Sequence, residues 1–352
     1  MVSIAINKGH QNIAMLGIGA YRPRRIVSND EVCETLDSTD EWIYDRSGIR
    51  NRRWVSGDES LRSMAVAAGE RAIKNSGVDR SKIGALILAS STWPDITPHG
   101  GPTVAHDLGI NGIPAFDLVS GCGGFGYGLA VAADLLRSGS ADYVLLIGAE
   151  TMSFSLDPHD RGTAFIFGDG AGAVVIGPSQ ENGISPAVWG SDGENASAIG
   201  QNFNILEMMD RAESYQGKDP ETDPVGRMLL RMEGPRVFRW AAVTLPRALA
   251  SALDVAGVSK DDIEVFVPHQ ANARINELMK KNLGLADDIP MANDIENTGN
   301  TSAASIPLAI EEMLVTGKAK GGQLALLLAF GAGLSYAGQV AVLPPAPTEA
   351  SF

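Results

Sequence analysis

The segment SGVDRSKIGALILAS at residues 76–90 resembles AGVSKDDIEVFVPHQ at 256–270, 180 positions further along the chain (76 to 256). Three more pairs follow in the same order, at offsets of about 175 to 181 residues: VAHDLG (104–109) with LMKKNLG (278–284), DLLRSG (134–139) with EMLVTG (312–317), and YVLLIG (143–148) with LALLLAF (324–330). Four matching elements in one order predict an internal duplication. We therefore expect two similar halves packed around a pseudo-twofold axis.

Apolar runs alternate with helix-periodic segments within the first half. The runs GALILASS (84–91), AFDLVS (115–120) and DYVLLIGAE (142–150) are apolar throughout, which is typical of strands buried on both faces. The segment YGLAVAADLLRSG (127–139) has helical periodicity. This alternation predicts an α/β fold in which helices cover largely buried sheets. We expect halves at 1–180 and 181–343, a polar, aperiodic surface excursion at 201–226, and a disordered tail at 344–352.

Composition excludes several classes of function. The chain has 352 residues, of which 44% are hydrophobic, so a large core can form. It contains no apolar stretch long enough to span a membrane and begins with no signal-peptide pattern. Two cysteines fit a reducing cytoplasm, and five histidines without ligand spacing predict no metal. The formal charge of −14 argues against nucleic-acid binding, and an acidic partner would need a local basic patch.

Three loops that follow strands carry the candidate chemistry. The turn DLVSGCGGFGYG (117–128) surrounds Cys122 with glycines between a strand and a helix. The duplication places NTGNTSAAS (297–305), with Asn300, at the matching position, and VPHQANARI (267–275) brings His269. Loops on a rigid scaffold are where catalytic groups concentrate, so we expect the three side chains to meet at one site.

These residue types suit acyl transfer followed by decarboxylation. A helix N-terminus favours the thiolate form of Cys122, which is a good nucleophile toward thioesters. The glycines let main-chain N–H groups hold an oxyanion. His269 and Asn300 can both donate hydrogen bonds, and two donors without a strong carboxylate base suit an enolate formed by decarboxylation.

Two other classes of function stay open on these residues alone. Gly121, Gly123 and Gly126 fit the G-x-G-x-x-G spacing of dinucleotide-binding turns, and Glu150 ends the following strand, as in an NAD-dependent dehydrogenase. That interpretation leaves His269 and Asn300 without a role. A scaffold that binds acyl carrier proteins without catalysis is the other alternative. Cys33 fits a buried small hydrophobic residue.

The motifs together resemble the β-ketoacyl-acyl carrier protein synthase III family, and its actinobacterial branch in particular. The resemblance runs from IGAYRPRRIVSNDEV (18–32) to LLLAFGAGLSYAGQV (326–340), with VPHQAN and GNTSAAS as its most specific parts. It implies a five-layer αβαβα thiolase-like fold, a homodimer, and a triad of Cys122, His269 and Asn300. Thiolases, which share the fold, carry a second cysteine in the C-terminal glycine loop, where this chain has FGAGLSY (330–336).

The resemblance also implies a coenzyme A site and a reaction. Trp42, Arg46 and Arg161 would hold the adenine, and Gly234 and Asn272 would line the pantetheine channel. The backbone N–H groups of Cys122 and Ala332 would form the oxyanion hole. The implied reaction is condensation of an acyl-CoA primer with malonyl-acyl carrier protein, in primary fatty acid synthesis or a specialised pathway. Acyl-CoA is a substrate, and no cofactor is implied.

Two further expectations concern partners and specificity. A basic patch at the channel mouth would dock the acidic acyl carrier protein; its residues are Arg236, Arg239, Arg274, Lys280 and Lys281, with Arg46 beside them. The segment TWPDITPHGGP (92–102) resembles the loop that lines the acyl pocket across the dimer in this family. Thr97 stands where acetyl-specific enzymes have a Phe. We therefore expect primers longer than acetyl.

Overall fold

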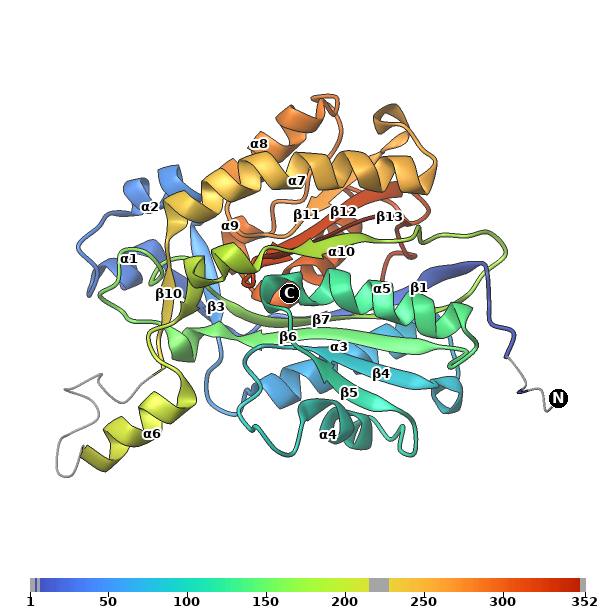
Figure 1. Cartoon of the computed structure of the whole chain (residues 1–352), viewed down its shortest axis with the longest axis horizontal. Coiled ribbons are helices and arrows are strands. Elements are labelled where there is room, and N and C mark those ends of the chain that lie inside the picture. Colours follow the sequence, from blue (N-terminus) through green and yellow to red (C-terminus); the bar gives the residue numbers. More distant parts are fainter. Residues whose placement is uncertain (1–3, 5–6, 215–227, 349–352) are drawn as a thin grey trace.

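Residues 4, 7–214 and 228–348 are described in a computed structural model of the chain. They form alternating layers of helix and sheet, stacked as helix, sheet, helix, sheet, helix (Figure 1). This arrangement confirms the predicted five-layer αβαβα fold.

The two large sheets repeat one topology. The first has the order β1 (Ile13–Tyr21), β7 (Asp169–Pro178), β6 (Val144–Thr151), β4 (Ala85–Ala89), β5 (Ala115–Leu118). The second has the order β8 (Val188–Ser191), β13 (Ser335–Val342), β12 (Leu324–Gly331), β11 (Val265–Pro268). In both sheets two strands at one end run antiparallel, and the pairs β6–β4 and β12–β11 run parallel. Strands β4 and β11 both come from the repeated sequence segment.

Paired helices fill the three helical layers. Helices α5 (Gly124–Arg137) and α10 (Ser305–Thr316) lie between the sheets and contact both. The outer face of the first sheet is covered by α3 (Leu61–Ser76) and α4 (Gly100–Asp107), and that of the second by α7 (Gly234–Ala256) and α8 (Ala273–Leu283). Strands covered on both faces need no polar side, which explains why all five residues of β4 are buried.

Close packing of α5 depends on glycine. A Cβ at Gly126 would come within 2.6 Å of the Cβ of Ala329 on β12 and 3.0 Å of that of Ala337 on β13. The helix therefore sits directly on the second sheet, with its N-terminus beside the end of β12. This packing fixes the position of the turn that carries Cys122.

Smaller elements cap the end of the molecule where the strands of both sheets lead into loops. They are β2 (Arg25–Ser28), α1 (Asn29–Cys33), α2 (Asp40–Ser47), β3 (Asn51–Trp54), β9 (Ile199–Gln201), α6 (Ile205–Ser214), β10 (Leu230–Met232) and α9 (Ile295–Thr298). Strands β2 and β3 pair with each other, as do β9 and β10. A separate apolar cluster joins this cap to the core.

Two segments expected to be irregular carry more order than their composition indicates. Residues 205–214 of the surface excursion form α6, which projects from the body (Figure 1), and Leu206 and Met209 on it are exposed. Residues 215–226 of that excursion lie outside the described residues. In the tail, Pro344 is buried and the Thr348 hydroxyl donates to Asn75, while 349–352 lie outside the described residues.

None of the helices in the described ranges combines the length and the apolar character that crossing a bilayer requires. The same ranges bring no three His, Cys, Asp or Glu side chains together in a way that could hold a metal ion.

Candidate active site

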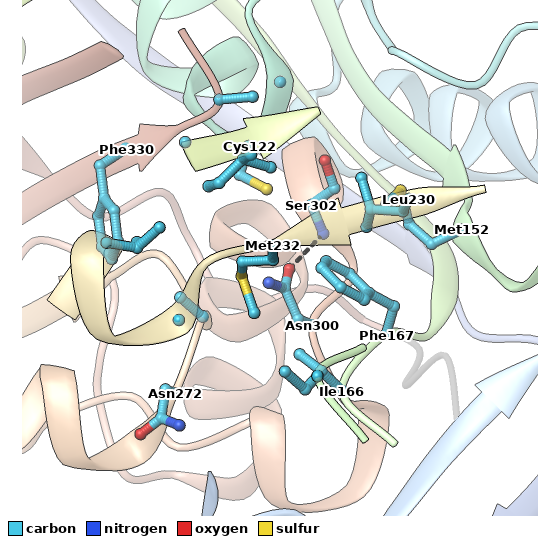
Figure 2. Close-up of a pocket in the computed structure, with 18 of the residues that line it drawn as sticks. Cys122, Met152, Ile166, Phe167, Leu230, Met232, Asn272, Asn300, Ser302 and Phe330 are labelled. Carbon is cyan, nitrogen blue, oxygen red and sulfur yellow. Dashed lines mark hydrogen bonds between the residues drawn. The ribbon is translucent and has the colours of Figure 1, made fainter. Parts of the chain in front are cut away.

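A cavity of about 840 Å³ opens between the two halves and the cap. Its lining includes all three candidate catalytic residues, Cys122, His269 and Asn300, which come from three different loops. It also includes five residues that the resemblance assigns to coenzyme A: Trp42, Arg46, Arg161, Gly234 and Asn272. The duplication therefore brings together side chains that are far apart in the sequence (Figure 2).

Cys122 lies in a single 3₁₀ turn, Gly121–Gly123, directly before α5. A Cβ on Gly331 would come within 2.6 Å of the Cys122 backbone nitrogen, so the end of β12 can lie against this turn only because it is glycine there. The next residue, Ala332, also lines the cavity. The backbone N–H groups of Cys122 and Ala332 thus belong to the same wall of the site.

The surroundings of Cys122 favour the protonated thiol over the thiolate. Burial raises its pKa to about 12, and the nearby negative charge of Glu150 acts in the same direction. The side chains of Ser302 and Asn300 lower the pKa and offset only part of this. We expect the helix N-terminus to favour the thiolate, whereas desolvation acts in the opposite direction. Proton removal must accompany attack on a substrate.

His269 follows β11 and is neutral. Its side chain is 1% exposed, and burial lowers its pKa to about 3. The ring of Phe330 packs edge-on against the imidazole with centroids 5.1 Å apart. Nδ1 lies 2.6 Å from the hydroxyl of Ser305, which leaves Nε2 as the nitrogen available to the cavity.

Asn300 is oriented by the backbone of its own loop. Its Oδ1 accepts a hydrogen bond of 2.8 Å from the Ser302 N–H, drawn as a dashed line in Figure 2. The amide Nδ2 is left to donate toward the sulfur of Cys122. Ser302 has φ of 50°, the only positive φ of a non-glycine residue in the described ranges. This left-handed turn costs conformational energy, which is typical of backbone strained for function.

Two cations flank an indole at the mouth of the cavity. The guanidinium groups of Arg46 and Arg161 lie 5.3 Å and 4.8 Å from the Trp42 ring centroid. Asn272 donates to the Arg46 carbonyl at 2.9 Å and caps α8 with its side-chain oxygen. A planar base could be held between aromatic and guanidinium surfaces here.

The remaining candidates lie outside the cavity or at its edge. Arg274 lines the mouth, whereas Arg239 and Lys281 are exposed beyond it. Arg236 is bound to Asn195, Ser197 and Glu233, and Lys280 donates to the carbonyls of Asp287 and Ile289. Thr97 is exposed on the connection between β4 and α4 and does not line the cavity of its own chain.

The glycine turn does not have the surroundings of a dinucleotide site. Gly126 packs on β12 and β13, so no space for a phosphate faces it. Glu150 is fully buried and accepts hydrogen bonds from Thr92 and Ser302, so it cannot reach a ribose. The dehydrogenase alternative therefore fails on geometry.

Sequence reasoning missed three polar residues around the site: Glu150 as a neighbour of Cys122, Ser302, and Ser305. Ser302 and Ser305 stand in the quoted loop, but their contacts cross 152 residues to Glu150 and 36 to His269. The signal that the sequence offered for these contacts was the presence of two serines in the loop that also carries Asn300.

Fold and site together define a thiolase-fold condensing enzyme, an acyltransferase. Two family descriptions match the chain: 3-oxoacyl-[acyl-carrier-protein (ACP)] synthase III over residues 116–193, and the C-terminal part of the same family over 253–343. The chain is 52% identical to beta-ketoacyl-[acyl-carrier-protein] synthase III of Mycobacteroides abscessus, covering 99% of this chain and 100% of that one. It is 51% identical to the mycobacterial enzyme of Mycolicibacterium paratuberculosis, covering 98% and 100%.

Solved structures agree with this assignment. The priming beta-ketosynthase from the R1128 polyketide biosynthetic pathway has a TM-score of 0.91 and 42% identity, covering 98% of this chain and 100% of that one. 3-Oxoacyl-(acyl carrier protein) synthase III from Pseudomonas aeruginosa has 0.84 and 34%, covering 96% and 99%. The chain belongs to the β-ketoacyl-[acyl-carrier-protein] synthase III family, in its actinobacterial branch. The predictions of family, fold and condensing activity are confirmed.

Proposed function

We propose that this enzyme joins an acyl-CoA primer to malonyl-acyl carrier protein and initiates chain synthesis. The observation that carries the proposal is the meeting of Cys122, His269 and Asn300 at one cavity. Sγ of Cys122 attacks the thioester carbonyl, an acyl-enzyme forms, and coenzyme A leaves. Malonyl-acyl carrier protein then loses carbon dioxide, and the resulting enolate carbon attacks the acyl-enzyme.

The neutral state of His269 supports its role as a hydrogen-bond donor. An imidazole with a pKa of about 3 cannot act as a cation, but its Nε2–H can donate to an enolate oxygen. The amide of Asn300 donates from the other side with no dependence on pH. Donors fixed before the reaction stabilise developing negative charge without reorganising.

The two arginines at the mouth support coenzyme A as the leaving group. Trp42 between Arg46 and Arg161 offers an aromatic face and two cations to a nucleotide carrying phosphates. Asn272 and Gly234 also line the cavity, and the pantetheine would run past them to Cys122. The proposal includes a cytoplasmic homodimer, acyl carrier protein as partner, and no resident cofactor.

A specialised pathway is the second candidate. The similarity to a priming ketosynthase of polyketide synthesis favours it, since the same fold and family serve both. The two candidates differ in the carrier protein and the primer. Mass spectrometry of the acyl-enzyme formed from a panel of acyl-CoAs, followed by condensation with each carrier protein, separates them.

Two variants test the division of roles. His269→Ala and Asn300→Ala should still form the acyl-enzyme, because Cys122 is intact. Each should lose malonyl decarboxylation by about a hundredfold or more, since one oxyanion donor is gone. Asn272→Ala serves as a control that should weaken acyl-CoA binding instead. Decarboxylation at the parental rate in Asn300→Ala would contradict the proposed role.

A further inference from the structure

A buried carboxylate lies on the far side of Ser302 from the cavity. Glu150, near the end of β6, is 0% exposed. The Ser302 hydroxyl donates to its Oε1 at 2.9 Å. Thr92 Oγ1, Ser90 Oγ and the Ser91 N–H also donate to it, as does the backbone of Ala303. These partners are neutral, so the carboxylate is held by hydrogen bonds alone.

The same hydroxyl contacts the nucleophile. Ser302 and Cys122 are neighbours in the wall of the cavity, and the negative charge of Glu150 acts on the Cys122 thiol. Figure 2 shows Ser302 beside Cys122, with Asn300 held from the Ser302 backbone. Ser302, whose φ is 50°, donates its N–H to Asn300 and its hydroxyl to Glu150. Ser302 thus links the oxyanion donor Asn300 to the buried carboxylate of Glu150.

We propose that Glu150 accepts the proton of the Cys122 thiol through the hydroxyl of Ser302 when the acyl-enzyme forms. Ser302 touches the reacting sulfur and is the catalytic residue of this pair, whereas Glu150 acts through it and is a positioning residue. The proposal deepens the proposed function and rests on it for the acyl donor.

The step balances without any other reagent. Sγ forms a bond to the thioester carbonyl carbon, its proton passes to Oγ of Ser302, and the serine proton passes to Oε1 of Glu150. The bond from that carbon to the coenzyme A sulfur then breaks. The proton returns from Glu150 through Ser302, which lines the cavity, to the departing sulfur. Coenzyme A leaves as a thiol, and Glu150 is again a carboxylate.

The electrostatics of the pair support this exchange. Burial raises the pKa of Glu150 to about 7, so the group can both take and release a proton near neutral pH. The Glu150 charge raises the pKa of Cys122, so the two groups titrate as a coupled pair. The β4–α4 connection and the loop before α10 present only hydroxyls and backbone N–H groups to Glu150. The titratable group that interacts with Glu150 is the Cys122 thiol.

A pH profile of Cys122 alkylation tests the coupling without acyl-CoA. The probe is iodoacetamide, with the Cys122 peptide read by mass spectrometry so that Cys33 is counted separately. In the parent, the rate should rise with pH and then flatten between about pH 7 and about pH 9, because the Glu150 charge then opposes the thiolate. In Glu150→Gln the rate should continue to rise. Glu150→Asp should restore the flattening.

A matched control removes a buried carboxylate that does not face Cys122. Asp169 on β7 is 1% exposed, with a pKa raised by burial, and it accepts hydrogen bonds from Ser153 and Val55. Asp169→Asn should keep the flattened profile. Thermal unfolding of each variant checks that it is folded.

Acylation by acyl-CoA tests the hydroxyl. Ser302→Ala keeps the backbone N–H that holds Asn300 and removes only the relay, so single-turnover acylation should slow by about a hundredfold. Its alkylation profile should still flatten, because Glu150 remains. The proposal is overturned if the alkylation rate of Glu150→Gln still flattens with pH, or if Ser302→Ala is acylated at the rate of the parent enzyme. A parent that alkylates as expected but never acylates would instead contradict the proposed function.

Discussion

The hydroxyl of Ser305 lies 2.6 Å from Nδ1 of His269, and both side chains are 1% exposed. The same hydroxyl oxygen accepts the N–H of Gln270 at 3.4 Å. We expect the Ser305 hydroxyl to donate to Nδ1, which places the proton of the neutral imidazole on Nε2, the tautomer that an oxyanion needs.

Ser305→Ala should therefore weaken both stability and decarboxylation. It leaves a buried ring nitrogen unpaired, which costs about 1–3 kcal/mol of unfolding free energy. It also removes the preference for the Nε2–H tautomer, so malonyl decarboxylation should fall while acylation of Cys122 persists. Urea unfolding and carbon dioxide release measure the two effects. Ser138→Ala, at an exposed hydroxyl after α5, is the control. Unchanged decarboxylation in Ser305→Ala would show that the serine does not set the tautomer.

The pH dependence of decarboxylation follows from the buried imidazole. An unfolded histidine has a pKa of about 6.5, whereas burial lowers the pKa of His269 to about 3. Its folded pKa is depressed, so its contribution to stability is lost as pH falls from the unfolded pKa toward the folded one. Decarboxylation by Cys122→Ala, which cannot acylate, should show no titration of His269 near neutrality. An inflection near pH 6.5 that disappears in His269→Gln would contradict this.

Carrier-protein docking should be separable from acyl-CoA binding. Arg239 is exposed on α7 beyond the cavity, and Arg274 lines the mouth. Arg239→Glu should raise the KM for malonyl-acyl carrier protein much more than the KM for acyl-CoA, and high salt should act in the same direction. Arg274→Glu should do the same less selectively. Lys82→Glu, away from the mouth, is the control. An equal rise in the KM for both substrates in Arg239→Glu would show that Arg239 is not part of the docking surface.

Chain-length preference should depend on Thr97. We expect this exposed residue to reach the acyl pocket of a second subunit, since it does not line the cavity of its own chain. The parent should prefer primers longer than acetyl, and Thr97→Phe should shift the preference toward acetyl-CoA because an overfilled pocket rejects added methylenes. Ile96→Phe, at the neighbouring exposed position, is the control. An unchanged chain-length preference in Thr97→Phe would show that another residue limits the length of the primer.

The repeat at 76–90 and 256–270 was sufficient to predict two similar halves, because each copy leads into a strand buried on both faces, β4 and β11. The five layers were implied by the family resemblance. The repeat also placed Cys122 and Asn300 opposite each other. The sequence could not show that Glu150 lies behind Cys122, since the contact depends on how β6 and the loop before α10 pack. The sequence also could not show the desolvation that raises the pKa of Cys122, although it does show the helix N-terminus that favours the thiolate.

The central claim is that Cys122 carries the acyl group. Intact-protein and peptide mass spectrometry after incubation with a medium-chain acyl-CoA tests it directly. We expect one acyl group per chain, on the Cys122 peptide, lost when malonyl-acyl carrier protein is added. Cys122→Ala should carry none and should still release carbon dioxide from the malonyl substrate. An acyl group on Cys33, or no covalent adduct in a preparation that still condenses, would contradict the account.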